Sequence, residues 1–381
     1  MKKKIAIIGA NRFQNPLILK AKELGYETHV FAWECGDVGE RSADFFYPVS
    51  ITSKNEILQI CRELDMDAIT TIASDLATVT VNYVAGKMNL PGNSMSCTIK
   101  STNKYEMRQA FRRHQIPTPR FEVFGQTDCV DKLSGMQYPV IVKPTDRSGS
   151  RAICKIEERE ELMPAVRLAI ESSFENKAII EEYIPGEEFS MEGITWNGRH
   201  HFLCTTRKAT TGAPHFIETG HIQPAGISVQ TEETIKELLD KALTALEITN
   251  SATHSEFKIT PDGEIRIIEI GARMGGDCIG SDLVRISTGY DFLKMVIEVA
   301  MGEKPSFQKE NKPKTAVIRF IMNEKNLDEL DRIKRENPEI LHDISPIDEI
   351  NSHKVRDSST RYGYFILACD NKEKIRWLLN E

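Results

Sequence analysis

The 381-residue chain is 40% hydrophobic and carries a formal net charge of −7, with a pI of about 5.8. This length is enough for two or three domains with ordinary cores, and the acidic balance argues against a general nucleic-acid or membrane surface. Eight scattered cysteines without a CxxC pair predict neither a zinc site nor a disulfide framework and are typical of a reducing cytoplasm. No signal peptide is expected, because the apolar run after Lys2–Lys4 is short, and no segment approaches the roughly 18 apolar residues of a membrane span.

Residues 1–98 are predicted to form an open parallel α/β domain. Residues 3–34 read as strand, loop, helix and strand, and Gly25 is the expected stop of that helix. A helix over 57–64 and a strand over 66–74 continue the alternation. The strands are apolar throughout, which is typical of a parallel sheet covered on both faces. Turn residues at 90–94 mark the boundary.

Residues 99–310 are predicted to form the second and largest domain. Its first helix is expected over 101–115, with Ser101 or Thr102 as the N-cap. The expected later elements are strands over 139–144, 178–184 and 188–196, a helix over 234–248, a hairpin over 252–271 and a helix that ends at Gly302. A polar linker over 304–314 then leads to a small α+β module over 311–381.

Two glutamates on opposite arms of the hairpin carry the strongest chemical signal. Glu256 and Glu269 lie equally far from the Asp262-Gly263 turn, so they are expected to be cross-strand neighbours on one face. Two adjacent carboxylates repel each other unless a cation lies between them, and oxygen ligands of this kind suit Mg²⁺. Arg273 is interpreted as a clamp on a phosphate or carboxylate beside the metal. A purely structural Glu–Arg salt bridge is the alternative.

Three further segments offer phosphate or nucleotide contacts, and each has a plain structural alternative. Lys143 ends an apolar strand and can act as a point charge on a phosphate, although a lysine at such a place is usually solvated. The small polar loop 145–151 can bind phosphate through its backbone N–H groups, or it is an ordinary turn. No GxxxxGK[ST] P-loop is present. In 179–189, two acidic pairs flank Pro185-Gly186, where charged residues are normally just solvated.

Taken in order, these segments resemble the ATP-grasp superfamily of carboxylate–amine ligases over nearly the whole chain. The likeness rests on "NKYEMRQAFRRHQIPTPRF", "VIVKP", "EEYIPGEEF", "HSEF" and "IIEIGAR". It implies an ATP-grasp fold of mixed α/β and α+β class, with a pre-ATP-grasp domain over 1–98 and a lid subdomain over about 117–190. It also implies Mg²⁺, or Mn²⁺ as an alternative, on Glu256 and Glu269. The residues implied to contact ATP are Lys104, Lys143, Ser148, Gly149, Ser150, Glu181, Glu182, Tyr183, Ile184 and Glu188.

Within the superfamily, residues 216–226 ("FIETGHIQPAG") and the tail of the chain are similar to the L-amino acid ligases. This resemblance implies that the first substrate contacts Glu218 and His221 with its amino group, and that Gly275 and Gly276 border it. Arg273 holds the acyl phosphate in this interpretation, and the catalytic roles fall to Arg273 and Lys143.

The chain departs from the family pattern at two places. Gly271 replaces an asparagine that many relatives carry, which removes one metal-binding oxygen and leaves the number of Mg²⁺ ions open. The 145–151 loop has fewer glycines than in several relatives and contains Arg147 and Arg151, which can close over phosphates electrostatically.

The resemblance implies an ATP-dependent, ADP-producing carbon–nitrogen ligase that forms an amide, expected to be a peptide bond, through an acyl phosphate. The expected partners are ATP, a small carboxylate and an amine, both expected to be amino acids, in a cytoplasmic protein that binds neither nucleic acid nor membrane; a homodimer is one option. Ligation to a non-peptide amine and formation of a carboxyphosphate are the alternatives inside the superfamily. Outside it stand a non-catalytic nucleotide-binding module and an NAD-dependent oxidoreductase, of whose G-x-G-x-x-G fingerprint only Gly9 is present.

Overall fold

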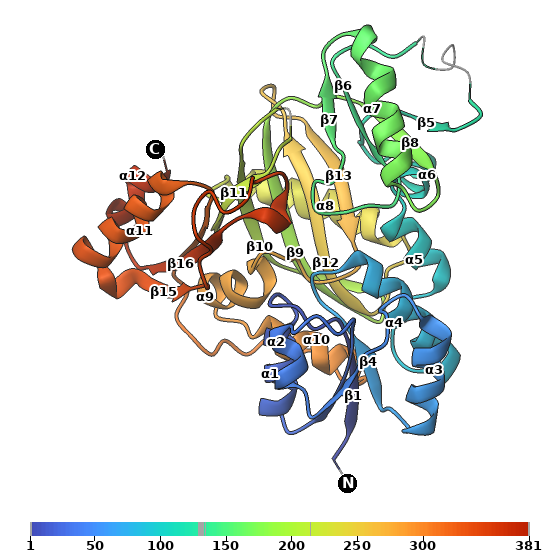
Figure 1. The fold of residues 1–381 in the computed structure, drawn as a ribbon, viewed down its shortest axis with the longest axis vertical. Coiled ribbons are helices and arrows are strands. Elements are labelled where there is room, and N and C mark those ends of the chain that lie inside the picture. Colours follow the sequence, from blue (N-terminus) through green and yellow to red (C-terminus); the bar gives the residue numbers. More distant parts are fainter. Residues whose placement is uncertain (1, 129–132, 134, 214, 380–381) are drawn as a thin grey trace.

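The computed structural model describes residues 2–128, 133, 135–213 and 215–379, and the strands within them form three sheets (Figure 1). The N-terminal sheet is parallel and has the order β3-β2-β1-β4. Its strands are β1 (Lys4–Ile8), β2 (Glu27–Phe31), β3 (Phe45–Tyr47) and β4 (Ala68–Thr70). The helices of this region are α1 (Asn15–Glu23), α2 (Val38–Ser42), α3 (Lys54–Glu63) and α4 (Asp75–Met88).

The predicted open parallel α/β arrangement of the N-terminal region is confirmed. The side chains of β1 are buried on both faces from Ile5 to Ile8, as expected for a covered parallel sheet. Gly25 follows α1 with a φ of 87°, a conformation that glycine adopts without strain, so it ends the helix as predicted. Strand β4 is shorter than the expected 66–74, and Ala73, with a φ of 58°, turns the chain into α4.

A separate helix, α5 (Met95–Thr102), precedes α6 (Lys104–Arg113), which is the helix expected over 101–115. The expectation that Ser101 or Thr102 caps this helix was wrong. Asn103 is the N-cap of α6, with an extended backbone, and its side-chain oxygen accepts hydrogen bonds from the N–H groups of Tyr105 and Glu106. Asparagine satisfies the free N–H groups of a first helical turn well, so the break falls at this residue.

The second sheet is antiparallel, has the order β5-β8-β6-β7, and lies within the expected lid, 117–190. Its strands are β5 (Phe121–Gly125), β6 (Val140–Pro144), β7 (Cys154–Ile156) and β8 (Lys177–Glu182). Helix α7 (Arg159–Ser172) packs on one face through a small core that includes Val166 and Ile170. The opposite face of this sheet is therefore available to cover the central part of the molecule (Figure 1).

The third and largest sheet has the order β13-β12-β9-β10-β11-β14-β16-β15. Its strands are β9 (Glu187–Trp196), β10 (Arg199–Thr210), β11 (Glu218–Gln223), β12 (Ser251–Ile259), β13 (Ile265–Gly271), β14 (Thr315–Ile321), β15 (Leu341–Ile344) and β16 (Gly363–Cys369). The helices around it are α8 (Val229–Ala245), α9 (Val284–Thr288), α10 (Phe292–Ala300), α11 (Glu324–Glu336) and α12 (Arg376–Leu379), with a π-helix over Ile279–Leu283.

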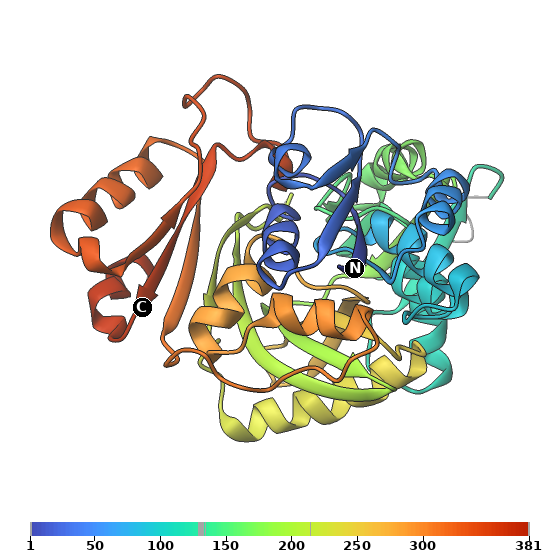
Figure 2. The ribbon, with the colours of Figure 1, turned by 90° about the horizontal axis from the view of Figure 1, so that it is seen from below.

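The strands of the predicted C-terminal module do not form a sheet of their own. Strand β14 pairs with β11, so the tail of the chain extends the central sheet (Figure 2). The core of the N-terminal region also continues into the central part, because Phe292, Met295 and Ile297 of α10 belong to it. A buried ion pair of 2.8 Å between Lys20 and Asp291 joins the same two regions. None of the described helices has the length and apolar character needed to span a bilayer.

Candidate active site

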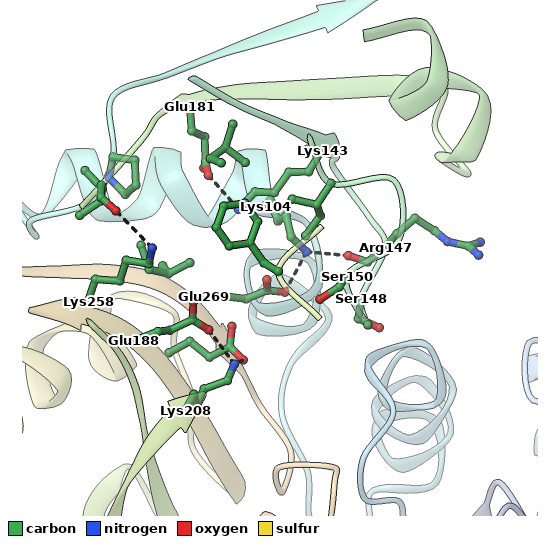
Figure 3. Close-up of a pocket in the computed structure, with 18 of the residues that line it drawn as sticks. Lys104, Lys143, Arg147, Ser148, Ser150, Glu181, Glu188, Lys208, Lys258 and Glu269 are labelled. Carbon is green, nitrogen blue, oxygen red and sulfur yellow. Dashed lines mark hydrogen bonds and ion pairs between the residues drawn. The ribbon is translucent and has the colours of Figure 1, made fainter. Parts of the chain in front are cut away.

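One cavity lies between the lid sheet and the central sheet, with a volume of about 1030 Å³ including open solvent (Figure 3). Every residue predicted to contact ATP or the metal lines it, as do Glu218 and Arg273. His221, Gly275 and Gly276, predicted to contact or border the substrate, are not among its lining residues. The fold therefore brings five separate sequence segments together at one cavity. Among the predicted site residues, only His221, Gly275 and Gly276 lie away from the cavity wall.

Glu256 and Glu269 are directly opposite each other on β12 and β13, as the sequence predicted. Their pairing depends on a β-bulge, because the register shifts by one residue between the pairs Phe257–Ile267 and Glu256–Glu269. Ile268 is the extra residue. It moves Glu269 from the core side of the strand to the cavity side, while Ile267 and Ile270 both remain in the core. This bulge explains how a carboxylate inside an apolar strand faces a cavity.

Two buried lysines hold these two carboxylates. Lys104 Nζ donates to Glu269 Oε1 at 2.8 Å and to the carbonyl of Arg147 at 2.7 Å, so it joins the hairpin to the 145–151 loop. Lys208 Nζ lies 2.7 Å from Glu256 Oε1 and 2.8 Å from Glu188 Oε1 (Figure 3). Burial alone would lower the pKa of Lys208, but the surrounding carboxylates outweigh it and keep this pKa well above its usual value. Lys208 is therefore a fixed positive charge in the cavity wall.

A second charge cluster ties the lid to α6. Glu181 of β8 accepts a hydrogen bond of 2.6 Å from Arg108 Nε and lies 2.7 Å from Lys143 Nζ. Burial by itself would raise the pKa of Glu181, but the charges of Arg108 and Lys143 outweigh it and bring this pKa to about 2. Burial lowers the pKa of Lys143 despite the nearby Glu181. The side chain of Glu181 is thus fully engaged by Arg108 and Lys143.

The residues that follow β8 are surrounded by aromatic rings and lysine side chains. The ring of Tyr183 has Lys155 Nζ 4.2 Å and Lys258 Nζ 5.1 Å from its centroid, and Phe216 lies 6.5 Å away between ring centroids. Lys258 Nζ also donates to the carbonyl of Ile184 at 3.2 Å. Flat apolar surfaces beside backbone polar groups are what a purine ring requires.

Behind Glu256, a buried histidine connects two carboxylates. His254 Nε2 lies 3.1 Å from Glu256 Oε1, and its Nδ1 makes a short hydrogen bond with Glu192. Glu192 also accepts the N–H of Gly275 at 2.9 Å. Burial would lower the pKa of His254, but the charge of Glu192 and its hydrogen bond outweigh this and raise the pKa to about 9. Glu256 is therefore held from two sides, by Lys208 and by His254.

Glu218 and His221 of β11 are placed differently from each other. Glu218 lines the cavity, with its Oε1 3.9 Å from Lys208 Nζ, and accepts a short hydrogen bond from Ser358 of the C-terminal region. His221 is buried, neither of its ring nitrogens has a hydrogen-bond partner in the described structure, and its Nε2 lies 3.8 Å from Asp277. In this conformation His221 supports the cavity wall from behind, and of these two predicted substrate residues only Glu218 lines the cavity.

Arg273 lines the cavity and is held by a residue of the N-terminal region. It donates from Nε and Nη2 to the two carboxylate oxygens of Asp75, each at 2.9 Å. Burial would lower the pKa of Arg273, but Asp75 raises it, so the guanidinium remains charged. A Cβ added at Gly271 would lie 3.0 Å from Asp75 Oδ1 and 3.3 Å from Arg273 Cζ, so a side chain here would require these two side chains to shift by a few tenths of an ångström.

The glutamate pair suits a magnesium ion that takes its remaining ligands from nucleotide phosphates and water. The described residues contain no group of three or more His, Cys, Asp or Glu side chains able to hold a metal by themselves. Mg²⁺ in nucleotide enzymes commonly takes one or two protein carboxylates and completes its octahedron with waters and phosphate oxygens. Two carboxylates facing one cavity, as Glu256 and Glu269 do, supply that set.

Several functional candidates were missed by the sequence reasoning. Lys208 lies on β10, a strand that was not predicted, and Arg108 and His254 lie inside predicted elements without any local signal. Asp75 lies in the first turn of α4, directly after the N-cap Ser74. Acidic residues are common in a first helical turn, so the sequence does not mark Asp75 as functional. Only the three-dimensional pairing of these side chains with the predicted carboxylates and Arg273 reveals them.

Comparison with known proteins gives a domain match and a group of similar ligases. Residues 136–282 match the family model of the ATP-grasp domain. An alanine–anticapsin ligase of Bacillus subtilis is 26% identical over 267 residues, which cover 64% of this chain and 56% of that protein. A D-alanine–D-alanine ligase of Pseudomonas fluorescens (strain Pf0-1) is 23% identical over 220 residues, which cover 55% of this chain and 65% of that protein.

The similarity of fold extends further than that of sequence. The crystal structure of an L-amino acid ligase from Bacillus licheniformis matches 100% of this chain and 96% of its own, with a TM-score of 0.84 and 23% identity. The match to each of the two curated relatives spans less than two thirds of that relative's length. Residues 136–282 of the chain therefore match an ATP-grasp domain, and the chain as a whole shares the fold of this solved structure.

Proposed function

We propose that the protein is an ATP-dependent carboxylate–amine ligase that forms an amide, in the first place a peptide bond, and releases ADP and phosphate. The observation that carries the proposal is the pairing of Glu256 with Glu269 on the wall of one cavity that also contains Lys104, Lys143 and Arg273. A metal site beside clustered cations is the arrangement that phosphoryl transfer from a nucleotide requires. The ligase names of the relatives support the same reaction class.

The nucleotide end of the cavity is proposed to lie at the junction of the lid and the central sheet. The adenine would lie against Tyr183 and meet the backbone of 182–184, and the ribose hydroxyls would meet Glu188. The phosphates would extend toward Lys104 and the backbone N–H groups of 148–150. The position of Lys104, between Glu269 and the 145–151 loop, supports this direction, because its ammonium can contact a phosphate without leaving the loop.

The metal end is proposed to be held by Glu256 and Glu269, with Mg²⁺ as the ion and Mn²⁺ as a substitute. A bound Mg²⁺ would neutralise phosphate charge and orient the γ-phosphate. Lys208 and His254 hold Glu256 in place, and Lys104 does the same for Glu269. These contacts keep two like charges side by side before any ligand binds.

In the proposed reaction, a substrate carboxylate oxygen attacks the γ-phosphorus of ATP and ADP leaves. An amine then attacks the carbonyl carbon of the acyl phosphate, so that the amide forms as phosphate and the amine proton leave. Arg273, fixed by Asp75, is placed to stabilise the transferred phosphoryl group electrostatically. The lid sheet covers the cavity and would exclude water from the acyl phosphate, which otherwise hydrolyses. Ligation to a non-peptide amine and formation of a carboxyphosphate use the same first step and remain the alternatives.

Three accompanying properties are also proposals. The amino-acid nature of both substrates rests on the resemblance of 216–226 to the L-amino acid ligases. A cytoplasmic location fits the seven free cysteines of the described structure. A homodimer is the proposed alternative to a monomer.

The direct test is a coupled assay of ADP release over pairs of amino acids and amines, with Mg·ATP. We expect release that requires both a carboxylate and an amine, with one amide formed per ADP, as counted by mass spectrometry. ADP release without any amide, or no release with any pair, would contradict the proposal. Bicarbonate as the sole co-substrate separates the carboxyphosphate alternative, because it would then sustain ADP release without an amine.

A further inference from the structure

The C-terminal region reaches back to the cavity through a short segment before β16, residues 357–361. Ser358–Thr360 form a single 3-10 turn, capped by Asp357, whose side chain accepts the N–H of Ser359. The side chain of Ser358 donates a short hydrogen bond to Glu218 Oε2. Because Glu218 lines the cavity, a residue far along the chain thereby fixes a carboxylate of the candidate substrate site.

Arg361 anchors the same segment on the other side. It is 3% exposed and donates from Nη1 and Nη2 to the two oxygens of Asp277, at 2.9 and 2.6 Å. Its Nη1 also lies 3.4 Å from the carbonyl of Glu218, and its guanidinium lies 3.6 Å above the ring of Phe320. Asp277 follows the Gly275-Gly276 pair and has a φ of 52°, an uncommon backbone conformation that Arg361 helps to hold.

Between them, Ser358 and Arg361 therefore contact Glu218, in the segment 216–226 expected to bind the substrate, and Asp277, which directly follows the expected substrate residues Gly275 and Gly276. In the described structure, their hydrogen bonds to residues outside the C-terminal region go to Glu218 and Asp277. Lys104 and Lys143, the two lysines expected to contact the phosphates, make their contacts elsewhere. Lys104 bonds to Glu269 and to the 145–151 loop, and Lys143 pairs with Glu181. The segment is coupled to the substrate end of the cavity and separate from its nucleotide end.

Glu218 itself has the character of an ammonium-binding group. Its nearest cation, Lys208, is 3.9 Å away and already lies within 2.8 Å of Glu188 and Glu256. A carboxylate at a cavity wall whose closest neighbour is a neutral hydroxyl has no positive charge in contact with it. Such a carboxylate can bind a cationic ligand. The hydroxyl of Ser358 holds Oε2 of Glu218 in place, and Oε1 lies 3.9 Å from Lys208 Nζ, another residue of the cavity wall.

We propose that Ser358 is a positioning residue for substrate recognition: it orients Glu218 toward the ammonium group of an amino-acid substrate, and Arg361 fixes the segment that carries it. This inference rests on the proposed ligase function. It predicts that the C-terminal region contributes to binding of the amino acid and makes no contribution to binding of the nucleotide.

The test compares Ser358→Ala, Ser358→Thr and Ser359→Ala in the ADP-release assay. The varied substrate is L-alanine, or the amino acid with the fastest release in the screen. Ser358→Ala is expected to raise the KM for that amino acid about tenfold, from the loss of a hydrogen bond to a charged group, with the KM for ATP within twofold of wild type. Ser358→Thr keeps the hydroxyl and is expected to restore most of the affinity. Ser359→Ala is the matched control, because its exposed hydroxyl bonds only to Asp357 in the described structure.

Other outcomes of this test would contradict the role proposed for Ser358. An amino-acid KM within twofold of wild type in Ser358→Ala would overturn the inference, as would equal rises in the KM values for the amino acid and for ATP, which indicate general damage. Calorimetric titration with Mg·ADP, expected to be unchanged in all three variants, reports that the nucleotide end is intact. If wild-type protein releases no ADP with any amino acid, the proposed function and this inference fall together. Activity in wild type with no effect of Ser358→Ala removes the inference alone.

Discussion

Asp75 holds Arg273 across two regions of the chain, through two hydrogen bonds of 2.9 Å each. Asp75 is the first residue of α4 in the N-terminal region, and Arg273 follows β13 in the central one. Burial would raise the pKa of Asp75, but the charge of Arg273 outweighs it and lowers this pKa. The N-terminal region thus contributes a residue to the candidate active site, the aspartate that orients Arg273 in the cavity wall.

Asp75→Asn tests this support. The substitution keeps the shape of the side chain and removes its charge, so Arg273 is expected to lose its fixed orientation. Because a small misplacement of a catalytic group can cost up to about 100-fold, we expect kcat for ADP release to fall by roughly 10- to 100-fold. Affinity for Mg·ADP, measured by calorimetry, should stay within twofold of wild type. An unchanged kcat would mean that Asp75 has only a structural role.

The two glycines after Arg273 are predicted to differ in their tolerance of a methyl group. A Cβ on Gly275 would lie 2.7 Å from His254 Nδ1 and 2.8 Å from Glu192 Oε1, two buried side chains that hydrogen-bond to each other. A Cβ on Gly276 would lie 3.5 Å from Ala73 Cβ, which is an ordinary contact. Gly275→Ala is therefore expected to lower the free energy of unfolding by about 1–3 kcal/mol, the usual range for overpacking.

Gly276→Ala serves as the matched control and should change that free energy by no more than about 0.5 kcal/mol. Urea unfolding followed by circular dichroism measures both. Gly275→Ala should also weaken Mg²⁺-dependent nucleotide binding, because His254 is one of the groups that hold Glu256. Equal stability of the two variants would show that the His254–Glu192 pair can move aside.

The buried cluster around Glu181 predicts a specific acid dependence of stability. The pKa of Glu181 is about 2 in the folded protein, against an ordinary value of 4.5. A lowered pKa contributes stability that is fully present above pH 4.5 and is lost as the pH falls toward 2. Wild type should therefore lose stability between pH 4.5 and pH 3, and Glu181→Gln should lose less over the same interval.

At pH 7, Glu181→Gln should be less stable than wild type by roughly 3–5 kcal/mol, since Arg108 and Lys143 remain buried without their counter-charge. Glu182→Gln is the control on the neighbouring position: its partner Arg120 is 70% exposed, and exposed pairs contribute at most about 1 kcal/mol. Urea unfolding at pH 7, 4.5 and 3 gives all the values. Parallel pH profiles for the three proteins would contradict the assignment to Glu181.

The sequence was sufficient to predict several buried strands and the glutamate pair, and the reasons are local. Buried parallel strands are apolar throughout, and the Pro261-Asp262-Gly263 turn allows residues to be counted outward along both arms of the hairpin. The count for Glu256 and Glu269 agreed with the structure because the pairing includes the bulge at Ile268. Without the bulge, Glu256 would face Ile268, and Glu269 would point into the core.

What the sequence did not predict depends on contacts between distant segments. Lys208 is recognisable only once three carboxylates from other segments surround it, and no local pattern marks such a lysine. The joining of β14 to β11 depends on non-local strand pairing, which hydrophobic alternation alone does not specify. His221 was assigned by resemblance, and its burial behind the cavity wall follows from packing against Phe320, with ring centroids 5.6 Å apart.

The central claim is that the carboxylates of Glu256 and Glu269 together hold the metal that accompanies the nucleotide. Its most direct measurement is the anomalous diffraction of a crystal grown with ADP and Mn²⁺, collected near the manganese absorption edge. We predict one strong peak between the two carboxylates, at about 2.2 Å from an oxygen of each, with the ADP phosphates completing the coordination shell of the metal. A peak at any other place, or ADP bound in this cavity with no manganese between these side chains, would contradict it.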